Sequence, residues 1–96
     1  MIIARKDPGC EYVRKEIPNT LEAMQAEVGG YIETVRFTSD CCIVCNEEGR
    51  LKGLPYNDHI LGVDFVGPIF FVGTKGEEFC NVPTCLADIL GAEEES

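Results

Sequence analysis

The fold is decided by the stretch NTLEAMQAEVGGYIETVRF, residues 19–37. Asn19 is a residue type that caps helices, because its side-chain oxygen can accept a hydrogen bond from a backbone N–H of the first turn. Glu22 follows three residues later, where it can bond back to the cap and interact with the positive end of the helix dipole. Together they predict the main helix of the chain, at about residues 20–28.

The same stretch predicts which face of the helix is buried and where the helix ends. Leu21, Met24 and Val28 recur at helical spacing and therefore share one face. Gly29 suits the left-handed conformation that ends many helices, and the aromatic and β-branched residues of segment 31–37 favour a strand. A helix this short is not stable on its own, so we expect it to pack on a sheet.

Outward from this stretch, the chain reads mainly as strands separated by turns. The apolar run at residues 69–72 is the strongest candidate for a central, buried strand. Residues 56–58 are expected to form a loop, and residues 59–66 a short helical turn or an irregular buried segment. Further strands are expected at residues 1–6, 10–17, 41–45, 50–54 and 78–82, and a second, short helix at about residues 84–90.

These elements predict a single small α+β domain. Short connections favour a mostly antiparallel sheet, with the main helix packed on one face and a short helix near the C-terminus. The predicted domain spans residues 1–91, and residues 92–96 are expected to form an acidic, frayed tail.

The charge and hydropathy of the chain argue against two classes of partner. Its 96 residues carry a net charge of −9, and residues 76–96 contain acidic residues but no lysine or arginine. Such a chain is poorly suited to the phosphate backbone, so we expect no direct nucleic-acid binding; an acidic surface that mimics DNA is the alternative. No apolar run approaches the roughly 20 residues of a membrane span, and the first residues lack the order of a signal peptide. We therefore expect a cytoplasmic protein that contacts no membrane.

The six cysteines could serve either metal binding or packing. Cys42 and Cys45, together with Cys80 and Cys85, have spacings that could supply a four-thiolate zinc site. On a regular strand, however, Cys42 and Cys45 point to opposite faces, whereas Cys41 and Cys45 share a face. We therefore predict small buried hydrophobic side chains with inert thiols, and no metal or cofactor.

The sequence contains no clear catalytic constellation. His59 is the single histidine, and a cysteine nucleophile paired with it is conceivable. No third group that would orient His59 can be named, and no glycine-rich turn presents a nucleophile. Glu47 and Glu48 are adjacent, so their side chains diverge and do not share an acid–base task. We predict no catalytic residues and no enzymatic activity.

The loop at residues 46–57 is the strongest candidate for a binding site. Arg50 and Lys52 alternate with an apolar residue and would project from one face of the expected strand, where they could hold a phosphate or carboxylate. Asn46 and Asn57 flank them, and these four residues form the predicted ligand site. The alternative is an ordinary hairpin whose asparagines and glycines serve turn geometry and whose basic residues are solvated.

Three stretches of the chain carry a family resemblance. They are LEAMQ (residues 21–25) leading into VGGYIE (28–33), NEEGRLKGLPYN (46–57) and DFVGPIFFVG (64–73). In this pattern the chain resembles a family of small domains of unknown function that phages, plasmids and conjugative elements encode. The resemblance implies a mobile-element accessory protein that acts on the host or its defences; it implies no catalytic residues. Most of the cysteines lie outside the pattern.

The expected function is therefore non-enzymatic binding that counters host defence. The leading hypothesis is sequestration of a small signalling nucleotide, with Arg50 and Lys52 on its phosphates; a host defence protein is the other expected partner. A protein–protein inhibitor with an acidic surface and a zinc-stabilised structural module are the alternatives. For a nucleotide-sequestering protein we also expect a homo-oligomer, because small domains often build ligand pockets between subunits.

Overall fold

A computed structural model describes residues 1–94 of the chain. It contains two helices and nine strands within these residues. In chain order they are β1 (Ile2–Lys6), β2 (Val13–Glu16), α1 (Leu21–Val28), β3 (Ile32–Thr38), β4 (Cys41–Asn46), β5 (Tyr56–Ile60), β6 (Val63–Val66), β7 (Ile69–Lys75), β8 (Glu78–Cys80), α2 (Thr84–Ile89) and β9 (Glu93–Glu94).

The strands form one large sheet and one separate hairpin. The large sheet has the order β3-β4-β7-β1-β2-β9, and β8 also pairs with β7. All of its pairs are antiparallel except β2 with β9, and β5 and β6 form the hairpin. The predicted α+β class and mostly antiparallel sheet are confirmed. The apolar run 69–72 lies in β7, which has a neighbour on each side, as a central strand requires.

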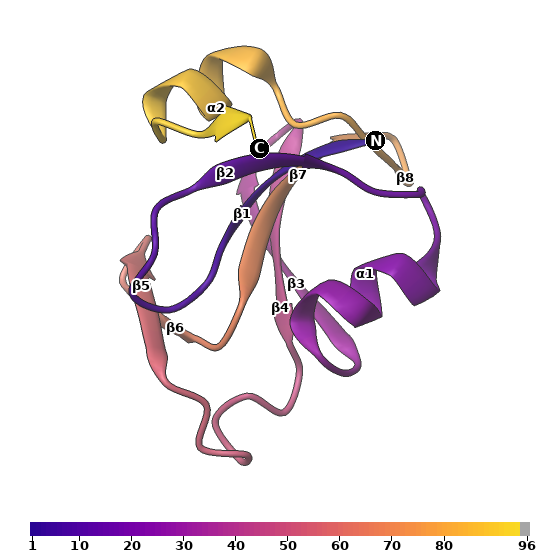
Figure 1. Cartoon of the computed structure of the whole chain (residues 1–96). Helices are drawn as coiled ribbons and strands as arrows, with labels where there is room; N and C mark the ends of the chain where they lie inside the picture. Colours follow the sequence, from indigo (N-terminus) through magenta and orange to yellow (C-terminus); the bar gives the residue numbers. More distant parts are fainter. Residues whose placement is uncertain (95–96) are drawn as a thin grey trace.

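The centre of the sheet, at β4 and β7, is buried on both faces. Along β7, Phe70 points to one face and Phe71 to the other. The Phe70 face packs against Met24 and Val28 of α1, and the Phe71 face packs against residues of the β5–β6 hairpin and α2. Figure 1 shows α1 on one side of the strands and the hairpin on the other. This two-sided cover explains why every residue of β4 is buried.

The main helix lies as predicted, with two differences at its first turn. Thr20, not Asn19, is the cap: its hydroxyl accepts a hydrogen bond from Ala23 N–H at 3.2 Å. Asn19 instead donates to the backbone oxygen of Phe79 at 2.9 Å. Leu21 is 51% exposed, because the buried stripe runs through Ala23, Met24 and Val28 and leaves Leu21 at its margin. Gly29 ends the helix with φ 77°, as predicted.

The predicted strand at residues 50–54 is wrong. These residues form consecutive turns, in which Lys52 N–H donates to Glu48 O at 2.9 Å and Leu54 N–H to Gly49 O at 3.0 Å. The physical reason is that β4 already has β3 on one side and β7 on the other, so no edge of β4 remains to be paired. Leu51, which the strand would have buried, is 88% exposed.

The prediction for residues 56–66 is also wrong. The expected loop and helical segment are the strands β5 and β6, joined by Leu61 and Gly62. Both turn residues have positive φ, 53° and 76°, as the two-residue type I′ hairpin turn requires. Leucine rarely adopts this conformation, so the turn has no sequence signal.

The C-terminal segment is part of the fold as far as residue 94. Ala92 is buried in the core, and Glu93 and Glu94 pair with β2, so the expectation of a frayed tail is wrong for residues 92–94. The backbone here is fixed by Arg14, whose Nε donates to Ala92 O at 2.8 Å. Residues 95 and 96 lie outside the described part of the chain. In α2, Ile89 is exposed and Ala87 faces the core.

We expect Gly73→Ala to destabilise the protein by about 2–3 kcal/mol, because a Cβ atom there would lie 2.1 Å from the backbone oxygen of Asn81. The free energy of unfolding from urea titration tests this. Gly9→Ala is the control, since a Cβ there meets nothing within 4 Å and only its left-handed backbone, φ 78°, costs about 1 kcal/mol. Equal losses for the two variants would contradict the predicted close packing at Gly73.

Candidate functional site

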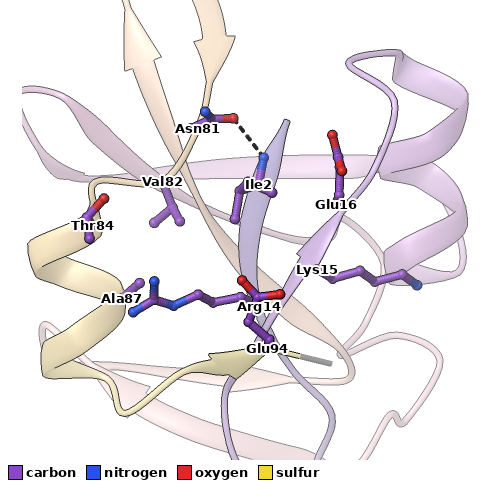
Figure 2. A pocket seen from close by; sticks show the side chains of 9 residues that line it. All are labelled: Ile2, Arg14, Lys15, Glu16, Asn81, Val82, Thr84, Ala87 and Glu94. Atoms are coloured by element: carbon purple, nitrogen blue, oxygen red, sulfur yellow. Dashed lines mark hydrogen bonds between the residues drawn. The ribbon is translucent and has the colours of Figure 1, made fainter. Parts of the chain in front are cut away.

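One hollow of about 480 Å³ lies between β2, the start of β1 and the segment that leads into α2 (Figure 2). Its lining residues are Ile2, Arg14, Lys15, Glu16, Asn81, Val82, Thr84, Ala87 and Glu94. Asn81 uses its side-chain oxygen to accept a hydrogen bond from Ile2 N–H at 2.8 Å. That oxygen therefore holds the first strand in place.

The basic side chains at this hollow also form their bonds within the protein. Arg14 lies across the hollow toward α2 (Figure 2), where it forms an ion pair with Asp88 and donates to Ala92 O. Lys15 points away from the hollow, and its Nζ lies 2.7 Å from Glu27 Oε1. This hollow therefore serves to attach the C-terminal segment, and we assign it no ligand.

A second hollow, of about 370 Å³, lies on the Phe71 face of the sheet, beside β3. We call it the β3–β6 groove. Its lining residues are Glu33 and Val35 of β3, Cys45 and Asn46 of β4, Glu47, Arg50 and Leu51 of the following loop, and Val63, Asp64, Phe65 and Val66 of β6. Three strands and the loop that follows β4 thus meet here, and β3 is the last strand at this end of the described sheet.

The inner part of the groove is apolar. Cys45 and Phe65 are buried, and Val35 packs against the same core cluster. Leu51 and Val63 lie exposed beside them. Burial, reinforced by the nearby Glu33 carboxylate, raises the pKa of the Cys45 thiol to about 11. Cys45 is therefore a protonated, apolar residue near neutral pH and does not act as a nucleophile.

The outer part of the groove is acidic. Glu33, Glu47 and Asp64 are all exposed, and Arg50 is the basic residue among the lining residues. Arg50 Nη2 already donates to the backbone oxygen of Asp64 at 2.8 Å, and Asp64 Oδ1 lies 2.6 Å from His59 Nδ1. The Arg50 guanidinium thus bonds within the protein, and the carboxylates outnumber it. This outer part, which we call the rim of the groove, therefore favours a cationic ligand over an anionic one.

Asn46 has a structural role in the loop where it was predicted to bind a ligand. It is 6% exposed, and its Nδ2 donates to Val28 O at 3.0 Å. Its Oδ1 accepts from Glu48 N–H at 2.8 Å. The side chain therefore joins the end of α1 to the turn after β4, and its amide hydrogen bonds are directed into the protein.

Asn57 has a similar role at a different place. Its Nδ2 donates to the backbone oxygens of Lys6 and Gly67, at 2.9 and 2.8 Å, and its Oδ1 accepts from Lys6 Nζ at 2.8 Å. It fastens the β5–β6 hairpin to β1. Asn57 therefore does not line the groove.

The four predicted site residues do not form one site. Arg50 and Asn46 line the β3–β6 groove, but Lys52 does not. A Cβ atom added to Gly30 would lie 3.3 Å from Lys52 Nζ, so this ammonium group lies beside the end of α1. The expected strand would have aligned Arg50 with Lys52, and the turns that replace it do not.

Sequence reasoning missed Glu33, Leu51, Val63 and Asp64 as groove residues. Glu33 and Asp64 lie far apart in the chain, so no spacing rule joins them. A signal was available in Leu51, since an apolar residue within a run of turn-forming residues has no packing role in a loop.

Cys41, Cys42 and Cys45 pack in the core, and His59 lies on the surface. Cys42 lies on the α1 face of the sheet, and Cys41 and Cys45 lie on the other, as predicted. Cys42 and Cys45 therefore do not converge on one ion. Within residues 1–94, no group of three or more histidine, cysteine or acidic side chains is placed to hold a metal. His59 is exposed and pairs with Asp64.

The fold and the groove define a small α+β domain with a double-sided core and an acidic, apolar-floored cleft beside an edge strand. The family described as "Domain of unknown function (DUF3846)" matches residues 1–93, and the chain belongs to it. The expected membership of a small domain family of unknown function is thus confirmed. No curated protein and no solved structure was found to match the chain. Within residues 1–94, no helix is long and apolar enough to cross a membrane.

Asn46→Ala and Asn57→Ala should each lower the free energy of unfolding by about 1–3 kcal/mol, because each leaves buried backbone groups without a partner. Urea titration measures the loss. Lys52→Ala is the control, since this exposed side chain should contribute less than about 0.5 kcal/mol. Asparagines that served only ligand binding would leave stability unchanged.

Alkylation should distinguish the exposed cysteines, which react, from the buried ones, which do not. At about pH 8, a thiol with the pKa of Cys45 is ionised to about one part in a thousand, and burial raises the pKa of Cys41 to about 12. We expect iodoacetamide to modify the exposed Cys10 and Cys85 while Cys41, Cys42 and Cys45 stay unmodified, as peptide mass spectrometry can measure. In urea all should react; early modification of Cys45 in the folded protein would contradict its assigned burial.

Proposed function

We propose that the protein is a non-enzymatic accessory protein of a phage or other mobile genetic element. In this proposal it acts in the cytoplasm of the host cell, where it occupies a host defence protein through the β3–β6 groove. The origin rests on the family resemblance described above. The absence of catalysis is supported by the protonated state of Cys45, the thiol that lines the groove.

The observation that carries a protein partner is the composition of the groove. An apolar floor flanked by exposed Leu51 and Val63 is the kind of surface that protein side chains cover. The carboxylates of Glu33, Glu47 and Asp64 would meet basic residues of the partner. This is the alternative of a protein–protein inhibitor with an acidic surface, and the proposal assigns that surface to the groove.

Sequestration of a signalling nucleotide is the second candidate function. Its support is Arg50, which lines the groove and could hold a phosphate. The surrounding carboxylates repel phosphate, and Lys52 lies outside the lining. For these reasons we rank the protein partner first. The second candidate function also requires a homo-oligomer. A single subunit lacks a basic site, so a second copy of the chain would have to complete the phosphate site.

A phage plating assay separates the two candidates. Cells that carry a panel of defence systems would express the protein, and recovery of phage plating would identify the system that it counters. In that system we expect the triple variant Glu33→Gln, Glu47→Gln, Asp64→Asn to lose protection by at least about tenfold, because close charge pairs across an interface are worth roughly 1.5 kcal/mol or more. The Arg50→Ala, Lys52→Ala variant should keep it.

The matched control removes the same number of carboxylates elsewhere. Glu16→Gln, Glu77→Gln, Glu78→Gln has the same net charge as the groove variant but changes exposed residues outside the groove. It should retain protection. Loss of protection in this control alone would place the binding surface outside the groove. Loss of protection in the Arg50, Lys52 variant alone would favour nucleotide sequestration.

A further inference from the structure

We propose that the β3–β6 groove receives an extended, basic segment of a protein partner, which pairs with β3 as an additional strand of the sheet. This inference rests on the proposed function, since it specifies the partner that the groove would take. Three features of the described structure carry it: the free edge of β3, the direction of its side chains and the sign of the surrounding charge.

The first feature is the unpaired edge. β3 pairs with β4 on one side and has no neighbouring strand on the other within residues 1–94. An edge strand presents a row of backbone N–H and C=O groups to any extended chain. The register with β4 is regular from Ile32 to Arg36 and shifts only before Thr38, so this part of the edge is straight enough to template a strand.

The second feature is that this edge opens directly onto the groove. Glu33 and Val35 are two residues apart, so they share a face of β3, and both line the groove. Alternate side chains of an added strand would point to the same face. They would therefore enter the space next to Leu51 and Val63, which are exposed in the free protein.

The third feature is the charge, which selects the occupant. Glu33, Glu47 and Asp64 surround the groove, and the Arg50 guanidinium bonds to the backbone of Asp64. Lysine or arginine side chains that alternate with apolar ones would match both the rim and the floor. A second copy of this chain does not fit, because two-fold pairing of β3 strands would bring two acidic rims together. The occupant is therefore a different, basic protein segment.

The test begins with a random library of short linear peptides displayed on phage and selected against the whole protein. We expect the selected sequences to alternate lysine or arginine with apolar residues and to lack proline at paired positions. Fluorescence anisotropy with the selected peptides should show at least tenfold weaker binding to the Glu33→Gln, Glu47→Gln, Asp64→Asn variant. Binding to the Glu16→Gln, Glu77→Gln, Glu78→Gln control should be unchanged.

Strand addition has its own readout. Hydrogen exchange of backbone amides in Ile32–Arg36 should slow when a peptide binds, and N-methylation of alternate peptide residues should abolish both the binding and the protection. Peptides that bind without protecting β3, or a library that selects no basic alternating sequence, would overturn strand addition. Either result leaves the plating assay free to support an acidic binding surface. Conversely, protection of β3 with unchanged plating in the groove variant would overturn the proposed function and leave this inference standing.

Discussion

The structure depends on β7 being covered on both faces. Phe70 and Phe71 are adjacent on this strand and each is 1% exposed, so each needs its own apolar layer. Burying one such side chain is worth roughly 1.5–3 kcal/mol, which is a large part of the stability of a domain of this size. α1 supplies the layer over Phe70. Over Phe71, Tyr12 and Phe37 place their rings 5.8 and 5.2 Å away, and the β5–β6 hairpin and α2 close the remaining surface.

This constraint explains which parts of the fold could be predicted from the sequence. α1, β3 and β7 carry local signals: a cap, a glycine stop and β-branched or aromatic runs. The hairpin did not, because its form is set by the sheet beneath it. Residues 50–54 alternate basic and apolar side chains as a strand would, yet β4 has no free edge for them. Leu61 occupies a turn position that normally takes asparagine or glycine, so the reversal of the chain there has no local signal.

The location of the candidate site was predictable from the sequence, but most of the residues that line it were not. The loop after β4 does contribute to the groove, through Glu47, Arg50 and Leu51. The two asparagines that looked like ligand contacts are fixed by the fold, because carrying the chain from β4 to the hairpin leaves buried backbone groups that need polar partners. Only the three-dimensional arrangement brings Glu33 next to residues of β6, since nothing in the sequence relates the outer strand to the hairpin.

The groove follows from the cover over Phe71. The hairpin must lie on the sheet to bury that ring, and the turns at residues 47–54 must carry the chain there, so a gap is left between this cover and the outer strand β3. Packing requires the gap but not its charge. Glu33, Glu47 and Asp64 are exposed, and of the three only Asp64 has a hydrogen-bonded side-chain partner, His59, within residues 1–94. A carboxylate facing the gap from β3 also opposes pairing with a second copy, as charges on edge strands commonly do. Under the proposed function, these acidic residues would attract a basic segment of a partner and repel a second copy of the chain.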